Sequence, residues 1–225
     1  MPFLTDIPSA LDEDALLKQM CLRPGTTDAD EFKELLAAAR EMAKPKAAYR
    51  ECFVEDRTED TVTIGGSVFT SKALCRNLAE VERVFPFVVT CGWELDRLAF
   101  DGDMLKNYWW DAVKGEVLTS ARSYLKNHLD QRFRLGNTSS MSPGSGDLTI
   151  WPIEQQRPLF ALLGDVEGAI GVSLTDSFLM VPIKSLSGIR FPTEKTFRSC
   201  QVCRRKDCPS RSAPFEVRMC SISST

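Results

Sequence analysis

The chain has 225 residues and a net charge of −3, and it is 43% hydrophobic and 26% charged, which is ordinary for a soluble globular protein. This length suffices for one substantial domain with a helical extension. The slightly acidic balance gives no reason to expect nucleic acid as a partner, and no apolar run approaches the roughly 20 residues that span a bilayer. The N-terminus is acidic where a signal peptide would be basic, so we expect a cytoplasmic protein without a membrane partner.

Apolar residues at three- and four-residue steps predict helices over 11–20 and 28–43. Pro45 prevents the second helix from continuing far, because proline cannot donate the next helical hydrogen bond. We therefore expect residues 1–50 to form a helical arm that packs on a main domain, which we place at residues 51–195.

The next part of the chain predicts strands. Residues 61–70 alternate about a Gly-Gly pair, which is typical of a hairpin. Ser71 can cap a helix that runs to about Val81, and the compact apolar run 84–91 has the composition of a buried strand.

A long helix is predicted from about Asp103 to Phe133. It carries the acids Asp111 and Glu116 among aromatic neighbours. Such acids usually belong to a solvated helix face, but Gly115 would let a ligand come close to Glu116.

After this helix, residues 134–147 are rich in Gly, Ser, Asn and Pro and are predicted to form a loop. A short helix is expected over 154–163, with strands near 168–174, 177–182 and 186–191. Helices and mostly antiparallel strands in separate blocks indicate the α+β class and not a doubly wound sheet.

The segment 174–191 carries a family resemblance. It reads Leu-Thr-Asp-Ser-Phe, then Met180 and Pro182, then Ser-Leu-Ser-Gly at 185–188, and finally Phe191. This pattern resembles the signature of the activation domain of cobalamin-dependent methionine synthase, in which an LTxSFxMxP segment runs into SxSGxxF.

The resemblance extends to earlier parts of the chain and covers roughly residues 60–192. The loop 142–147 stands where that family has a Pro-Gly-Tyr loop that contains an arginine and binds S-adenosylmethionine. The helix that carries 107–108 and 113–114 resembles the helix before that loop.

The resemblance implies a curved, twisted antiparallel sheet flanked by helices. It also implies rescue of a corrinoid in the inactive Co(II) state, in which one electron reduces the cobalt and a methyl group from S-adenosylmethionine traps the reduced form. The chain lacks the Asp-x-His-x-x-Gly motif of corrinoid carriers. The corrinoid would therefore come from a partner, a corrinoid-binding methyltransferase protein, and the electron from a flavodoxin- or ferredoxin-type donor.

By this resemblance, S-adenosylmethionine would contact one set of residues: Glu116, Ser142, Pro143, Gly144, Ser145, Gly146, Lys184, Ser187, Gly188 and Arg190. The chain departs from the family at two of its contacts. Ser140 or Met141 replaces the arginine, and Ser145 replaces the tyrosine. Lys184 and Arg190 are candidate substitutes for the cation that would pair with the ligand carboxylate, and Arg190 stands where the family has a tyrosine.

The tail, residues 196–225, contains a metal-type motif, Cys-x2-Cys-x4-Cys-Pro. In a reducing compartment clustered cysteines more often bind metal than form disulfides. The lone histidine, His128, excludes a zinc site built from several imidazoles. The candidate ligands are Cys200, Cys203 and Cys208, with either Cys91 or Cys220 as the fourth.

Three states of these cysteines remain open, namely an iron–sulfur cluster that relays an electron, a structural zinc ion and free thiols. The basic residues of the tail could dock an acidic electron donor or the corrinoid protein; they are Arg198, Arg204, Arg205, Lys206 and Arg211. A second function is also open. The chain could be a non-catalytic adaptor or an electron-transfer protein that holds a corrinoid protein without binding the methyl donor, and the two lost contacts support it.

Overall fold

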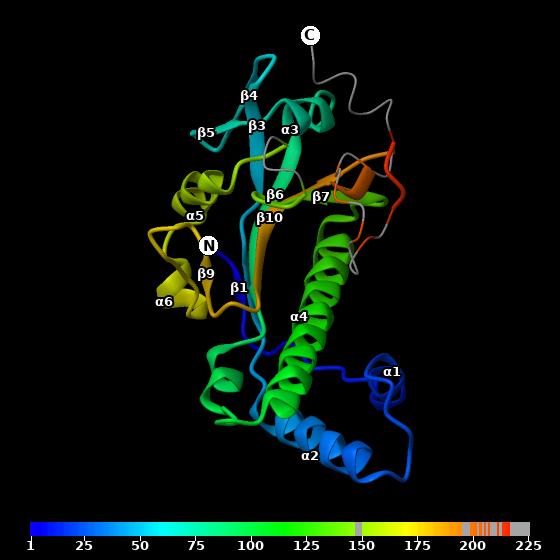
Figure 1. The fold of residues 1–225 in the computed structure, drawn as a ribbon. Helices are drawn as coiled ribbons and strands as arrows, with labels where there is room; N and C mark the ends of the chain where they lie inside the picture. Colours follow the sequence, from blue (N-terminus) through cyan, green and yellow to red (C-terminus); the bar gives the residue numbers. More distant parts are fainter. Residues whose placement is uncertain are drawn as a thin grey trace.

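The computed structural model of the protein describes residues 1–146 and 150–194, together with 199–201, 203, 205, 207, 211 and 213–216. It shows one antiparallel sheet with helices on both faces (Figure 1). The predicted α+β class is confirmed.

The strands of the main sheet are β1 (Phe3–Leu4), β2 (Lys46–Tyr49), β3 (Cys52–Arg57), β4 (Thr61–Ile64), β5 (Ser67–Thr70), β6 (Arg83–Thr90), β7 (Thr138–Met141) and β10 (Ser185–Pro192). The central strand is β6, which pairs with β2 and β3 along one edge and with β10 along the other. Beyond these neighbours, β1 pairs with β2, β7 pairs with β10, and β3–β4–β5 form a meander. A separate small sheet joins β8 (Ser173–Leu174) and β9 (Met180–Val181).

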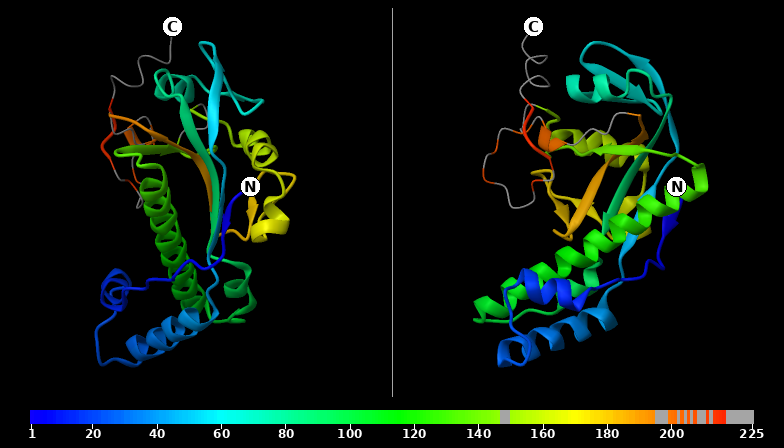
Figure 2. Two further views of the ribbon diagram at one scale, coloured as in Figure 1. Left: turned by 180° about the vertical axis from the view of Figure 1, so that it is seen from behind. Right: turned by 90° about the vertical axis from the view of Figure 1, so that its right-hand side faces the viewer.

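The helices are α1 (Glu13–Gln19), α2 (Thr27–Met42), α3 (Lys72–Asn77), α4 (Met104–Phe133), α5 (Gln156–Leu163) and α6 (Val166–Ile170), with 3-10 turns η1 (Trp93–Arg97), η2 (Ile153–Gln155) and η3 (Ser199–Gln201). The long α4 lies along one face of the sheet, while α5 and α6 cover the other (Figures 1 and 2). Among the described residues, no helix combines the length and hydropathy that a membrane span requires.

Strand β6 is buried on both faces, which explains its continuous apolar sequence. Phe85, Phe87 and Val89 pack in the cluster that includes α4, whereas Val84 and Val88 pack in clusters that include α5. A shift of one residue would exchange these two sets, so burial on both sides fixes the register of β6 and of the strands paired to it.

Capping residues explain the ends of α4. The Asp103 side chain accepts a hydrogen bond from the Lys106 amide at 2.9 Å, which satisfies one of the amides left open at a helix start. Arg134 ends the helix in the left-handed conformation, with φ of 52°. Both ends agree with the sequence prediction.

The N-terminal arm packs on the first half of α4. Thr26 caps α2, and Phe32 of α2 meets Trp109 of α4 edge to face, with ring centroids 5.9 Å apart. The expected boundary at residue 50 is too late, because β2 lies within residues 1–50 and pairs with β6 inside the main sheet. The first residues also join that sheet through β1.

Two predictions in the second half of the chain need correction. The predicted loop 134–147 contains β7. Its sequence, Thr-Ser-Ser-Met, has no apolar alternation, and it forms a strand by pairing with β10. The predicted strand 168–174 is wrong over its first residues, which belong to α6. The Asp165 side chain caps that helix by accepting from the Gly168 amide at 2.7 Å.

Phe32→Ala is expected to lower the free energy of unfolding by about 3–5 kcal/mol, because it leaves a cavity between α2 and α4 where the ring is fully buried. Phe53→Ala is the matched control, since that ring is 58% exposed and its loss should cost much less. Chemical denaturation of both variants provides the measurement. Equal losses would show that the arm does not share the core of the sheet domain.

Candidate ligand face and cysteine segment

The side chains of β10 alternate between the two faces of the sheet. Leu186 packs in the cluster that contains α4, whereas Ile189 packs with residues of α5 on the opposite face. Since strand side chains alternate, Gly188 and Arg190 lie on the same face as Leu186. We call these three residues the α4-side face of β10.

Ser187 points away from this face. It is buried, and its hydroxyl donates a hydrogen bond to the Gln156 side-chain oxygen at 3.0 Å, on the first turn of α5. The structure therefore does not bring the Ser187 hydroxyl together with Gly188 and Arg190. Its role is to satisfy a buried polar group between the sheet and α5.

Gly188 lies where β7 and the following loop press closely against β10. A Cβ atom at this position would lie 2.4 Å from the Met141 carbonyl oxygen and 2.8 Å from the Ser142 hydroxyl. The structure therefore brings the start of the predicted ligand loop, 142–146, next to the α4-side face of β10. Position 188 therefore requires glycine because the backbone of β7 lies too close for a side chain.

The loop 142–146 is anchored to the segment that follows it. The Gly144 amide donates to the Trp151 carbonyl at 2.8 Å, and the Ser145 amide donates to the Ser142 carbonyl at 3.2 Å. Gly144 has φ of +74°, and its position lies against the Ile153 side chain. Pro143 is buried, while Ser145 and Gly146 are exposed and available to a ligand.

Arg190 is a buried cation at the far end of β10. It is 8% exposed and donates to the Thr138 hydroxyl at 2.5 Å. Burial lowers the pKa of its guanidinium, the Asp130 carboxylate of α4 raises it, and Arg122 lowers it further. A buried guanidinium is costly unless it is paired. The Thr138 hydroxyl uses only part of the hydrogen-bonding capacity of the guanidinium, so Arg190 could also bind an anionic acceptor.

Two charged groups of α4, Asp130 and Arg122, act on the Arg190 guanidinium with opposite sign. One Asp130 oxygen is ion-paired with Lys126 at 2.8 Å, and the other is buried without a hydrogen-bond partner among the described residues. Arg122 is exposed on the same helix. Because Lys126 already engages Asp130, Arg190 could still pair with an added anionic group.

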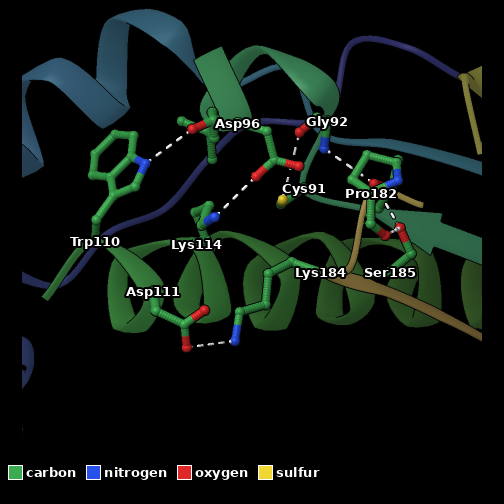
Figure 3. Close-up of polar contacts among 11 residues, drawn as sticks. Cys91, Gly92, Asp96, Trp110, Asp111, Lys114, Pro182, Lys184 and Ser185 are labelled. Atoms are coloured by element: carbon green, nitrogen blue, oxygen red, sulfur yellow. Dashed lines mark hydrogen bonds and ion pairs between the residues drawn. The ribbon is translucent and has the colours of Figure 1, made fainter. Parts of the chain in front are cut away.

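Lys184 lies at the opposite end of β10 and is engaged elsewhere. Its ammonium group is 2.8 Å from the Asp111 carboxylate of α4 (Figure 3). Six residues of extended chain separate it from Arg190, a distance of roughly 20 Å. The structure therefore does not bring the two candidate cations together, and only one of them could pair with a given ligand carboxylate.

Glu116 is half-buried on α4, beside Val117, which packs in the same cluster as Cys91 at the end of β6. It therefore belongs to the Lys184 end of the face, while Asp130 lies 14 residues further along α4, about 21 Å away. The space above Gly115 is open, since nothing would lie within 4 Å of a Cβ there. The predicted contacts form a row along the face and not a compact cluster.

Polar contacts missed by sequence reasoning tie η1 to α4 at this end of the face. Lys114 of α4 pairs with Asp96 of η1 at 2.9 Å, and the Trp110 indole donates to the Leu95 carbonyl at 2.9 Å (Figure 3). The two partners of each contact lie on different elements, so the contacts could not be predicted from residue spacing in the sequence.

Cys91 is not a ligand of the tail motif in this structure. It is fully buried, and burial, helped by the nearby Asp96 carboxylate, raises the pKa of its thiol to about 12. A metal needs the thiolate, which this environment disfavours. Figure 1 shows η1, which follows Cys91 closely, at the other end of the molecule from η3.

Cys200 and Cys203 share one turn, because the Cys203 amide donates to the Cys200 carbonyl at 3.4 Å. Both side chains are partly exposed. The other two predicted ligands, Cys208 and Cys220, lie outside the described residues. Within the part of the chain that the structure describes, no three His, Cys, Asp or Glu side chains are close enough to hold a metal.

The cysteine segment and the candidate ligand face share one side of the sheet. Both views show η3 beside β7, on the side that α4 occupies (Figures 1 and 2).

Gly188→Ala is expected to destabilise the fold by about 1–3 kcal/mol or more, because the new methyl group would overlap the Met141 carbonyl oxygen. Gly115→Ala is the control, since it adds a methyl group to open space within α4 and should stabilise the protein by about 0.5–1 kcal/mol. Thermal unfolding of both variants provides the measurement. A neutral Gly188→Ala variant would contradict the close approach of β7 to β10.

Comparison with solved structures supports the fold. No family model matches the sequence, and no curated protein matches it either. Among solved structures, the chain is similar to the MetH reactivation domain bound to AdoHcy, with a TM-score of 0.58 and 18% identity over 84% of this chain and 73% of that one. The protein therefore has a fold like that of the MetH reactivation domain.

Proposed function

We propose that this protein uses S-adenosylmethionine to reactivate a corrinoid carried by a separate methyltransferase protein. The observation that carries the proposal is the buried, positively charged end of the α4-side face, where Arg190 follows the Ser-Leu-Ser-Gly segment on β10. The similar solved structure holds AdoHcy, the demethylated form of that methyl donor, which supports the same ligand class.

The row of candidate contacts suits an elongated ligand. S-adenosylmethionine has an amino acid carboxylate at one end and an adenosine at the other. Arg190 would pair with the carboxylate, and the adenosine would extend along the face toward the end where Glu116 lies. Between them, Ser145 and Gly146 offer exposed backbone groups near the centre of the ligand.

The proposed reaction balances with one external electron. A flavodoxin- or ferredoxin-type donor reduces Co(II) to Co(I). The Co(I) centre then attacks the methyl carbon of S-adenosylmethionine, a cobalt–carbon bond forms, and the broken carbon–sulfur bond leaves its electron pair on sulfur as S-adenosylhomocysteine. The protein contributes binding and orientation, which bring the methyl carbon to the metal.

No general base is needed for this methyl transfer, because no proton moves. The sole histidine agrees with that requirement. His128 hydrogen-bonds the Tyr49 hydroxyl at 2.9 Å, and the two rings meet edge to face between α4 and β2. This contact gives His128 a packing role.

The second candidate is an adaptor that docks a corrinoid protein without binding the methyl donor. It is favoured by the replacement of the family arginine at Ser140 or Met141, which leaves Arg190 as the cation for the ligand carboxylate. It is also favoured by the burial of Arg190, which is only 8% exposed. Binding of S-adenosylmethionine separates the two candidates.

Glu116→Gln is expected to weaken S-adenosylmethionine binding about tenfold, because an amide replaces the charged hydrogen-bond acceptor toward which the adenosine extends. Glu167→Gln on α6, on the opposite face of the sheet, is the control and should bind like the wild type. Calorimetric titration, with and without the corrinoid partner, measures both. If the wild type binds no S-adenosylmethionine both with and without the corrinoid partner, the proposed reaction is refuted and the adaptor function is favoured.

Arg190→Lys is expected to weaken the same binding by about tenfold or more, because an ammonium group cannot make the two parallel hydrogen bonds that a guanidinium makes to a carboxylate. The charge beside Asp130 is retained, so the fold should persist. Arg157→Lys, whose cation lies over the Phe178 ring away from this face, is the control. Equal affinity of wild type and Arg190→Lys would remove Arg190 from the binding site.

A further inference from the structure

We infer that Asp130 binds the α-ammonium group of the methyl donor and makes the site specific for a zwitterionic amino acid end. The inference rests on the proposed function and deepens it, because it concerns the Arg190 end of the α4-side face of β10. It is carried by an Asp130 carboxylate oxygen that is buried and has no hydrogen-bond partner among the described residues.

The amino acid end of S-adenosylmethionine carries two opposite charges. Its carboxylate and its ammonium group are bonded to the same carbon atom, so the protein groups that bind them must lie close together. Arg190 is the candidate partner of the carboxylate. The partner of the ammonium group must therefore lie beside Arg190, and an ionised carboxylate is the side chain that accepts most strongly from a cation.

Core packing brings the end of α4 to this position. Arg190 is directly opposite Phe85 in the β10–β6 ladder, so the two side chains share one face of the sheet. Phe85 packs in the same cluster as Leu129, the residue before Asp130. Its ring also meets the Phe133 ring, with centroids 4.7 Å apart. The last turns of α4 therefore lie against the sheet next to Arg190.

The charge beside Arg190 comes from Asp130, whereas the neighbouring strand offers hydroxyls. The Thr138 hydroxyl accepts from the guanidinium at 2.5 Å, and Ser140 is directly opposite Arg190 on β7. Burial lowers the pKa of the Arg190 guanidinium, Asp130 raises it, and Arg122 lowers it further. Because hydrogen bonds to charged groups are stronger than those between neutral groups, Asp130 is the better partner for an ammonium group.

Asp130 has one oxygen that remains available. Lys126 binds the other oxygen at 2.8 Å, from a side chain that is 48% exposed. The available oxygen is buried, and a buried acceptor without a hydrogen bond destabilises the protein. An ammonium group carries three donors and would satisfy this oxygen while Lys126 keeps its own contact.

This arrangement selects for the ammonium group by two effects. A ligand with the ammonium group gains a charge-assisted hydrogen bond to Asp130. A ligand with the carboxylate alone leaves the buried oxygen unpaired and brings a second anion beside it. Specificity therefore comes from attraction for one ligand and from a penalty on the other.

The test compares two ligands by calorimetry on the full chain: S-adenosylhomocysteine and its des-amino analogue, in which hydrogen replaces the α-ammonium group. We expect the wild type to bind S-adenosylhomocysteine at least tenfold more tightly than the analogue. Asp130→Asn should weaken S-adenosylhomocysteine binding about tenfold and should not weaken binding of the analogue, because the amide keeps the size of the side chain and loses its charge.

Asp96→Asn is the matched control, since that carboxylate is also ion-paired to a lysine of α4 but lies on η1. It should keep the wild-type preference. Equal affinity of the wild type for both ligands, or an Asp130→Asn variant that keeps the preference, would overturn the inference and leave the proposed function in place. Wild-type protein that binds neither ligand would contradict both. The comparison of ligands on the wild type needs no variant, so it decides the matter even if Asp130→Asn does not fold.

Discussion

Burial of β6 on both faces is the constraint on which the rest of the structure depends. Phe85, Phe87 and Val89 pack toward α4, and Val84 and Val88 pack toward α5, so neither set can move to the other face. The register of β10 follows from its pairing with β6, with Gly188 opposite Phe87 and Arg190 opposite Phe85. The positions of the candidate ligand contacts are therefore a consequence of core packing.

The features predicted from the sequence are those with a strong local signal. The apolar run of β6, the periodic α4 with its Asp103 cap, and the turn at Gly65 and Gly66 needed no knowledge of distant partners. The missed elements depend on tertiary pairing. Strand β7 lacks apolar alternation and forms because it pairs with β10, while α6 has strand-like residues that the Asp165 cap redirects into a helix.

In the candidate site, too, some features could be predicted from the sequence and others depend on tertiary contacts. The nearness of loop 142–146 to Gly188 was predicted from the family resemblance, and the structure agrees. The separation of Ser187 from its neighbours follows from strand alternation, but its Gln156 partner does not follow from the sequence. The ion pair of Lys184 does not follow from the sequence, because its partner Asp111 lies 73 residues away along the chain. The burial of Arg190 beside Asp130 likewise depends on tertiary packing of β10 against α4.

The central claim is that the α4-side face of β10 binds the methyl donor. The most direct measurement is a crystal structure of the full chain grown with S-adenosylhomocysteine. The account predicts the ligand carboxylate within hydrogen-bond distance of the Arg190 guanidinium and the nucleoside directed toward Glu116. A ligand bound on the α5 side of the sheet, or an empty face at saturating ligand, would contradict it.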